Sequence, residues 1–330
     1  MKRKLFTNFL IIGLVAFLFN YGQSFAQGEY PAITKSKVIL QGDSGSWDYN
    51  KVHTLSVVEA NKDGYKYWGY YGLSYYGGDP ALRQAGLMRS NDMVHWDKYK
   101  CNPIIPGDCR WPTVIFSNSV FYMFYAQYDE NNDSRIVMLT SKDGIHFFDE
   151  TVVVKRELGT QNQNPFVFFN EEDQSFYLAY YHGVERSNDK PLVGREGINE
   201  KTEYQNVKNF WQIMIKKAKN IEDLKDAEPK VLLTSDYTIA SPSIIYYEGK
   251  YYLLIESIKE GKWNDQWVTL AYSSDKVDGN YTELENNPLL PDNDACAFQY
   301  ILDDQLYIFY SHCLNLTDWN WEVRVVKVKK

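Results

Sequence analysis

Five segments of the chain share a run of aromatic and aliphatic residues that is typical of a buried strand. They are KYWGYYG from Lys66, FYMFYAQ from Phe121, FYLAYYH from Phe176, YYLLIES from Tyr251 and LYIFYSH from Leu306. Their first residues lie 55, 55, 75 and 55 positions apart, and such regular spacing indicates an internal repeat. The longer interval contains an insertion of about 20 residues, which we place in the polar stretch 185–206.

Each aromatic run is one of several strands in its repeat. A shorter apolar run precedes it (HTLSVVEA, WPTVIFSN, NPFVFFNE, SPSIIYYE and CAFQYILD), with turn residues between the two, as in a β-hairpin. A third run follows, and after three of these a turn such as SNDMVHW leads to a fourth strand. Five repeats of four antiparallel strands predict an all-β, five-bladed β-propeller, whereas a β-sandwich would not explain the even spacing. Residues 220–228 are the one stretch that suggests a short helix.

The N-terminus resembles a secretory signal peptide. A basic Lys2-Arg3-Lys4 start precedes an apolar run, and Ser24-Phe25-Ala26 fits the small-x-small cleavage rule. We therefore expect a signal peptide over residues 1–26, a single propeller domain over 27–330, and a secreted or periplasmic protein. The alternative is a membrane anchor, but polar residues interrupt the end of the apolar run, and no later segment is apolar enough to span a bilayer.

Composition narrows the class of partner. Aromatic residues make up 16% of the chain, which suits strands, and the formal net charge is −8. No block of Lys or Arg follows residue 4, so a nucleic-acid partner is not expected. Export permits disulfides, and we expect Cys101–Cys109 and Cys296–Cys313 as local pairs, with buried free thiols as the alternative.

Propeller topology places the starts of the innermost strands and the ends of the second strands at one mouth. Candidate residues near the innermost-strand starts are Asp48, Asp108, Arg110, Trp111, Asn164, Ser241 and Asp294. Those near the second-strand ends are Tyr71, Gln127, Asp129, His182, Glu185, Glu256 and His312. His182 and His312 occupy the same repeat position, whereas His95 and His146 fall in turns at the opposite face. Aromatic rings, carboxylates and amides together indicate a sugar site with an oligo- or polysaccharide partner.

The mature chain resembles the five-bladed propellers of the furanosidase-like glycoside hydrolases, the group around family 43. The resemblance rests on SNDMVHWDKY and SKDGIHFFDE, on DGNYTELENNPLLP and CNPIIP, and on the strands GKYYLLIES and LYIFYSH, in order over five repeats. It implies hydrolysis of furanoside or related sugars, which requires two carboxyl groups flanking the scissile bond.

The resemblance assigns one of the three carboxylates of family 43. Its Asp base, which opens the first blade, is matched by Asp48. The second Asp is replaced by Thr113, and the Glu acid by Ala240. Glu256 is the nearest substitute acid, and His182 or His312 is another, because a related agarose-degrading propeller family uses a histidine. Replacement of Asp48 by Asn is then expected to abolish turnover.

Three functions follow as hypotheses. The first is a glycoside hydrolase in which Arg110 and Trp111 form a sugar subsite, with Asn164, Ser241, Glu185 and Asp294 as further substrate-binding residues. The second is a glycan-binding propeller without catalysis, consistent with the missing acid. The third is a protein-interaction propeller or a transferase. No cofactor is required, no dedicated metal site is expected, and a structural Ca²⁺ in the central channel, held by Asp294 and backbone carbonyls, follows only from the resemblance.

Overall fold

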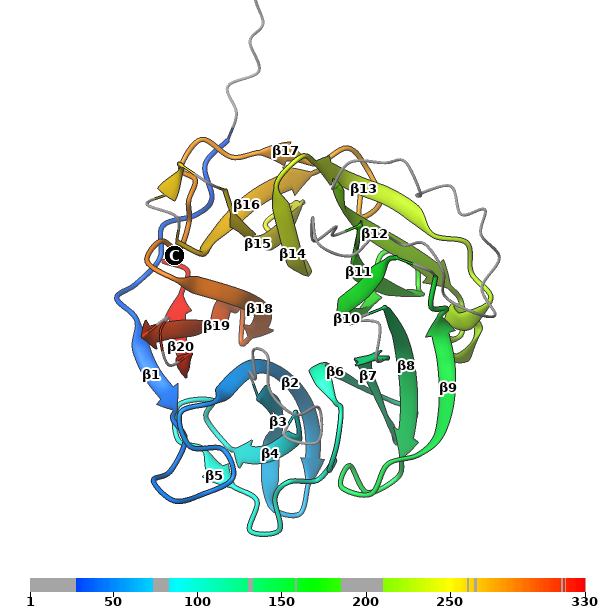
Figure 1. Ribbon diagram of the computed structural model, residues 1–330, viewed down its shortest axis with the longest axis vertical. Helices are drawn as coiled ribbons and strands as arrows, with labels where there is room; N and C mark the ends of the chain where they lie inside the picture. The colour runs from blue at the N-terminus through cyan, green and yellow to red at the C-terminus, as the bar shows by residue number, and fades with distance from the viewer. Residues whose placement is uncertain are drawn as a thin grey trace, which may run out of the picture.

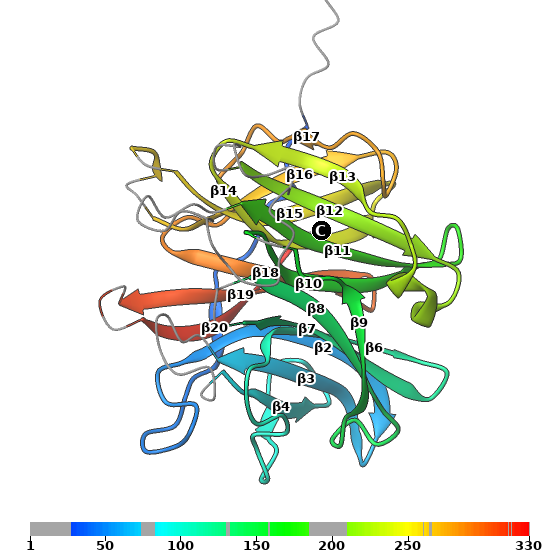
Figure 2. The same ribbon diagram turned by 45° about the vertical axis from the view of Figure 1, so that its right-hand side comes forward.

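The protein is a five-bladed β-propeller, as the sequence predicted. A computed structural model describes residues 28–73, 83–129, 133–157, 159–184, 210–259, 261–263, 266–315, 317 and 319–329. The expected signal peptide and Glu185 lie outside these residues. Five four-stranded antiparallel sheets surround a central channel (Figure 1). Seen from 45° away, the sheets are twisted and pack against one another around the channel (Figure 2).

Four blades are continuous in sequence, and in each the first strand lies nearest the channel. The first contains β2 (Val52–Lys62), β3 (Tyr65–Leu73), β4 (Ala85–Ser90) and β5 (Asp97–Lys98). The second contains β6 (Arg110–Ser117), β7 (Val120–Tyr128), β8 (Ser134–Ser141) and β9 (Phe148–Val154). The third contains β10 (Gln161–Asn170), β11 (Ser175–Val184), β12 (Phe210–Ala218) and β13 (Lys230–Ser235). The fourth contains β14 (Thr238–Tyr247), β15 (Lys250–Ile258), β16 (Val268–Ser274) and β17 (Thr282–Glu283).

The fifth blade joins the two ends of the chain. It contains β18 (Asp294–Leu302), β19 (Gln305–Asn315) and β20 (Asn320–Lys327), and its outermost strand is β1 (Lys37–Leu40) from the N-terminus. β1 pairs antiparallel with β20. The first strand of the chain therefore covers the edge that β20 would otherwise expose and closes the ring of blades. The sequence predicted four strands in each repeat but did not assign this last strand to the start of the chain.

The apolar residues of the repeats form the cores between blades. The side chains of Trp68, Tyr70, Phe124 and Phe309 are each less than 2% exposed. The helix expected over 220–228 is a 3₁₀-helix, η2 (Ile221–Lys225), which buries Ile221 and Leu224. Within the described ranges, no helix combines the length and apolarity needed to cross a bilayer.

Every innermost strand is interrupted at the equivalent position. The hydrogen-bond register shifts once near the start of β2, β6, β10, β14 and β18. The residues at the shifts have left-handed backbones, with φ of 49° at Thr54, 52° at Trp111, 51° at Asn164, 49° at Ser241 and 50° at Cys296. Left-handed φ is uncommon for residues other than glycine, and repeated bulges of this kind redirect side chains beside functional sites. We call these five the bulge residues.

Candidate functional site

The bulge residues surround a small cavity at one end of the channel. We call this end, where the innermost strands start, the upper mouth. The cavity has a volume of about 40 Å³ and is lined by each bulge residue and its neighbours: Thr54–Ser56, Trp111–Thr113, Asn164–Phe166, Ser241–Pro242 and Cys296–Phe298. Because one water needs roughly 10–15 Å³ on this measure, the cavity accommodates a few waters and not a sugar ring. A glycan would have to lie on the mouth above it.

A hydrogen-bonded chain crosses three blades at the floor of this mouth. The amide of Asn164 donates to Ser241 Oγ at 2.7 Å, and Ser241 Oγ lies 3.2 Å from Cys296 Sγ. Both the thiol and the backbone N–H of Cys296 donate to Glu256 Oε2, at 3.1 and 3.0 Å. The structure therefore brings together three predicted residues, Asn164, Ser241 and Glu256, through Cys296.

Glu256 accepts two hydrogen bonds from Cys296, a residue that lines this cavity. It lies on β15 opposite Ala240, and 8% of the residue is exposed. Burial raises the pKa of Glu256, and its hydrogen bonds to Cys296 and Ser241 offset that effect only in part. Glu256 thus retains its proton at higher pH than an ordinary glutamic acid, which is the property required of a proton donor.

Two residues of the floor were not predicted from the sequence. His53 Nε2 lies 3.8 Å from Cys296 Sγ, and the His53 ring meets Trp321 edge-on at 4.6 Å. Cys296 was considered only as a disulfide partner, and His53 was not assigned. A signal was present, because four of the five upstream runs, such as NPFVFFNE, begin at their bulge residue. Aligning the repeats there would have selected Thr54 and Cys296.

His53 is expected to make the fold sensitive to acid. Burial lowers its pKa to about 3, against about 6.5 in an unfolded chain. Its contribution is therefore intact above pH 6.5 and is lost as the pH falls from 6.5 toward 3. At pH 5 the loss is about 2 kcal/mol. We expect His53→Phe, which retains an aromatic contact with Trp321, to remove this part of the pH dependence.

The measurement is urea unfolding of both proteins at pH 8 and pH 5. The comparison at pH 8 isolates the packing cost of the substitution. The wild type should lose about 2 kcal/mol more than His53→Phe between the two pH values. Equal losses would show that His53 is not held neutral in the folded state.

His182 and His312 occupy equivalent positions, as the sequence predicted. Each pairs with a residue two places before its bulge residue: His182 with Asn162 on β10, and His312 with Asp294 on β18. His182 Nδ1 lies 2.8 Å from Asn162 Oδ1, and burial lowers its pKa. His312 therefore has an acidic partner where His182 has an amide.

The His312–Asp294 pair has the geometry of an oriented imidazole. His312 Nδ1 lies 2.7 Å from Asp294 Oδ1, and the two side chains are 16% and 10% exposed. Burial raises the pKa of Asp294, against the opposing effect of His312. The contact at Nδ1 leaves Nε2 as the nitrogen that can exchange a proton, and the carboxylate fixes the ring. The pair belongs to the fifth blade, which also contains Cys296, and Glu256 belongs to the fourth blade.

Asp48 is placed differently from the other candidates. It follows β1 in the loop that leads to β2, does not line the upper cavity, and is 1% exposed. Its Oδ2 accepts from Lys98 Nζ at 2.8 Å and from Tyr71 Oη at 3.1 Å, and its Oδ1 accepts from Ser46 Oγ. Burial opposes ionisation, but the contacts with Lys98 and Ser46 outweigh it, so the pKa of Asp48 lies below its usual range. These contacts describe an ionised carboxylate that ties the loop to the outer strand β5.

The predicted sugar subsite is only partly open. Trp111 lines the cavity, with its ring centroid 6.3 Å from that of Tyr128. Arg110 is 9% exposed; its guanidinium lies 3.6 Å from the Tyr128 ring centroid, and its Nε donates to Asp108 Oδ1 at 2.6 Å. Arg110 is therefore held inside the protein and supports Trp111 through Tyr128.

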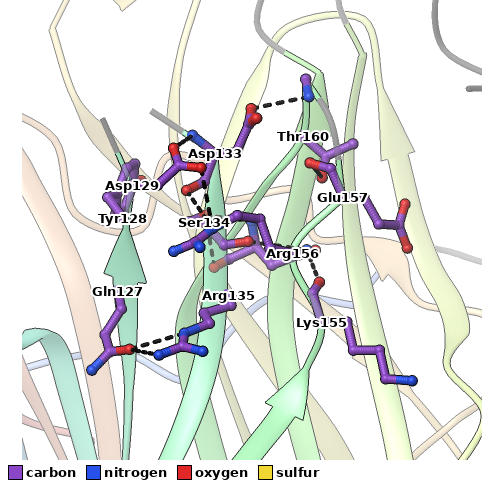
Figure 3. Close-up of polar contacts among 12 residues, drawn as sticks. Gln127, Tyr128, Asp129, Asp133, Ser134, Arg135, Lys155, Arg156, Glu157 and Thr160 are labelled. Atoms are coloured by element: carbon purple, nitrogen blue, oxygen red, sulfur yellow. Dashed lines mark hydrogen bonds and ion pairs between the residues drawn. The ribbon is translucent and has the colours of Figure 1, made fainter. Parts of the chain in front are cut away.

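The rim beside this subsite is a structural network (Figure 3). Arg135 donates to Gln127 Oε1 at 3.0 and 2.8 Å, joining the ends of β7 and β8. Asp129 Oδ1 accepts the backbone N–H of Asp133 at 3.0 Å, and Arg156 lies 3.6 Å from Asp129 Oδ2. The first two contacts join the end of β7 to the start of β8, and the third ties Asp129 to the segment before β10. Gln127 and Asp129 therefore both have structural partners.

The expected disulfides are not present. All four cysteines are free; Cys101 is exposed and the other three are buried. The Cys296 side chain is directed to Glu256 and Ser241, because the left-handed bulge sets its orientation. Burial raises the pKa of Cys296 well above its usual value, so this group is a thiol. The alternative of buried free thiols is therefore correct for Cys109, Cys296 and Cys313.

A metal at this mouth remains a prediction. Among the described residues, no group of three or more His, Cys, Asp or Glu side chains is arranged to hold a metal ion. Asp294, the proposed calcium ligand, has one oxygen engaged by His312. The described residues at this mouth therefore do not form a recognisable calcium site.

Comparison with known proteins gives a structural match without a sequence match. No family model and no curated protein matches the chain. The solved structures include a thermostable family-43 glycoside hydrolase (16% identity, TM-score 0.60, 83% of this chain and 88% of the other). They also include the catalytic domain of the family-62 α-L-arabinofuranosidase of Coprinopsis cinerea (12%, 0.63, 91% and 98%). A third is the endo-arabinase of Bacteroides thetaiotaomicron (16%, 0.57, 85% and 94%).

The chain has the fold of the five-bladed propeller glycoside hydrolases. The match extends over most of both chains in these three cases. Sequence identities of this size establish the architecture, and the chemistry has to be inferred from the residues at the mouth.

Proposed function

We propose that the protein is a secreted or periplasmic glycoside hydrolase that cleaves arabinofuranosyl or xylosyl linkages of a polysaccharide at the upper mouth. The observation that carries the proposal is Glu256, a buried carboxyl group with a raised pKa, held against the cavity by Cys296. The structural neighbours, which include an α-L-arabinofuranosidase and an endo-arabinase, supply the sugar class.

The proposed chemistry uses Glu256 as the acid and His312 as the base. Both donors of Cys296 converge on Glu256 Oε2, so its proton is carried by Oε1 and passes to the leaving-group oxygen. His312, oriented by Asp294, takes a proton from the attacking water through Nε2. Cleavage then consumes one water; afterwards His312 releases its added proton to solvent and Glu256 takes one up, which restores both groups for the next turnover. Trp111 would stack on a sugar ring at the mouth.

One observation favours a second function, glycan binding without cleavage. The described residues that line the upper cavity include no carboxylate. Asp48, which does not line it, accepts hydrogen bonds from three other side chains. A propeller of this kind would use Trp111 and Asn164 to hold a chain and release no product.

Product release separates the two functions. We would incubate the protein with arabinan, arabinoxylan, xylan and galactan, measure new reducing ends, and run affinity gels containing the same polysaccharides. The expected result is release of short arabinose- or xylose-containing products. Retarded migration without release would favour the binding function. The absence of both release and retarded migration would contradict a glycan site at this mouth.

A further inference from the structure

The opposite end of the channel contains a much larger cavity. It has a volume of about 1120 Å³ and is lined by the ends of the innermost strands and the turns that follow them. Phe166 and Phe298, whose ring centroids are 5.6 Å apart, line both this cavity and the upper one. We call it the lower cavity. Its volume lies just above the range of about 300–1,000 Å³ that is typical of small-molecule sites.

The repeat determines the lining of the lower cavity. Three, four and five residues after each bulge residue, the five strands contribute mostly apolar side chains to it: Val57–Glu59, Val114–Phe116, Val167–Phe169, Ile244–Tyr246 and Gln299–Ile301. Tyr246 is 50% exposed and Ile301 is 36% exposed. Large apolar side chains are therefore gathered around an opening to solvent, an uncommon arrangement for a surface with no partner.

Aromatic rings form a fixed collar at the outer end of this cavity. In three blades a ring packs on the second residue of the next strand: Phe116 on Phe121 at 4.4 Å, Phe169 on Phe176 at 4.9 Å, and Tyr246 on Tyr251 at 4.9 Å between centroids. Rings held in this way are already in position, so a ligand would not have to order them on binding.

The inner wall is mostly apolar, and its one amide side chain has no hydrogen-bonding capacity left for a ligand. That amide belongs to Gln299, which lies beside the phenol of Tyr300 in the lining, and it is fully used. Its Nε2 donates to the carbonyls of Ser243 and Tyr252 at 2.8 and 3.2 Å, and its Oε1 accepts from Tyr30 Oη at 2.9 Å. The inner part of the cavity therefore suits an apolar body and does not suit a sugar, whose hydroxyl groups would remain unpaired.

The charged side chains that line the outer end are all acidic, and one of them, Glu59, has Lys66 Nζ 3.9 Å from its Oε1. The charged residues that line the lower cavity are Glu59, Glu171 and Glu172, all exposed, and no Lys, Arg or His among the described residues lines it. The whole chain also carries a net charge of −8. Carboxylates beside aromatic faces favour a positively charged group and disfavour an anion.

We propose that the lower cavity binds a cationic amphiphile, with an apolar body between the innermost strands and an ammonium or amine head at the acidic outer end. The site lies at the opposite end of the channel from the upper mouth, and the proposal does not depend on the proposed hydrolase activity. The observations that support it are the apolar inner wall, the packed aromatic rings and the three glutamates that line the outer end.

The test is calorimetric titration with dodecyltrimethylammonium below its micelle concentration, at low salt and pH 8. Sodium dodecanoate, with a similar chain and the opposite charge, is the matched probe. We expect saturable binding of one dodecyltrimethylammonium per protein, at least about tenfold tighter than dodecanoate. Absence of saturable binding, or equal binding of the two probes, would overturn the proposal.

A pair of arginine substitutions locates the binding. Ile301→Arg places a cation at the opening of the lower cavity, and Phe148→Arg places one at a residue on β9 that is 64% exposed and does not line it. Both positions are exposed, and circular dichroism would establish that both variants are folded. We expect Ile301→Arg to weaken dodecyltrimethylammonium binding at least about tenfold and Phe148→Arg to leave it unchanged. Equal effects would place the binding elsewhere.

Discussion

Replacement of Glu256 by Gln is expected to lower the rate of polysaccharide cleavage about 1000-fold, because a general acid contributes roughly 100- to 10,000-fold. The substituted amide would retain a side-chain oxygen for the backbone N–H of Cys296, which Glu256 Oε2 accepts at 3.0 Å. The fold and the affinity for the polysaccharide should therefore be nearly unchanged. The measurement is kcat on the polysaccharide that gives product, with affinity measured separately in gels.

Leaving-group dependence distinguishes an acid from a residue that only shapes the site. In a dinitrophenyl glycoside of the same sugar, the leaving group departs as the dinitrophenolate anion and needs no proton. Glu256→Gln should therefore cleave this substrate at close to the wild-type rate. Glu248→Gln, in the turn between β14 and β15, is the control and should behave as the wild type on both substrates. Equal losses on both substrates, or no loss on the polysaccharide, would remove Glu256 from the role of acid.

The pH profile gives a second readout of the same role. Burial raises the pKa of Glu256, so the protonated form persists above the usual range of a carboxyl group. The basic limb of kcat against pH in the wild type should lie above that range and should be absent in Glu256→Gln.

Replacement of Lys98 by Met is expected to destabilise the fold by about 3 kcal/mol, because it leaves a buried carboxylate without its cation. Asp48 is 1% exposed, and Lys98 Nζ lies 2.8 Å from its Oδ2. The double variant Asp48→Asn with Lys98→Met should recover most of this loss, since no buried charge remains. Urea unfolding at pH 7 measures all three proteins.

A surface pair of the same type is the control. Lys66 Nζ lies 3.9 Å from Glu59 Oε1, with side chains 37% and 43% exposed, so Lys66→Met should change stability by less than about 1 kcal/mol. If Lys98→Met has no larger effect than Lys66→Met, Asp48 is not a structural charge.

The same Asp48 variant tests the base that the family resemblance implies. The contacts of Asp48 predict that Asp48→Asn keeps product release, whereas His312→Asn loses it. Full loss of release in a folded Asp48→Asn protein would instead assign the base to Asp48, as the resemblance implies.

The sequence alone determined the architecture. The same pattern of short apolar runs and turns recurs at three intervals of 55 positions and one of 75, so the five blades could be counted without coordinates. It also placed His182 and His312 at one repeat position, because the repeat fixes equivalence independently of distance. Equivalent residues in a ring of similar sheets must occupy similar places around its axis.

The tertiary structure decided which residues meet. Closure of the ring brings His53 to Cys296, which is 243 positions away, and pairs β1 with β20. The left-handed backbone at Thr54 and Cys296 orients their side chains at the floor of the mouth. Neither residue type signals that backbone conformation in the sequence. The family resemblance singled out Asp48 as the base, and only the structure pairs its carboxylate with Lys98 of the outer strand β5. Local hydrophobic patterning specifies strands, but side-chain pairing across blades depends on ring closure and bulge geometry, which one repeat does not encode.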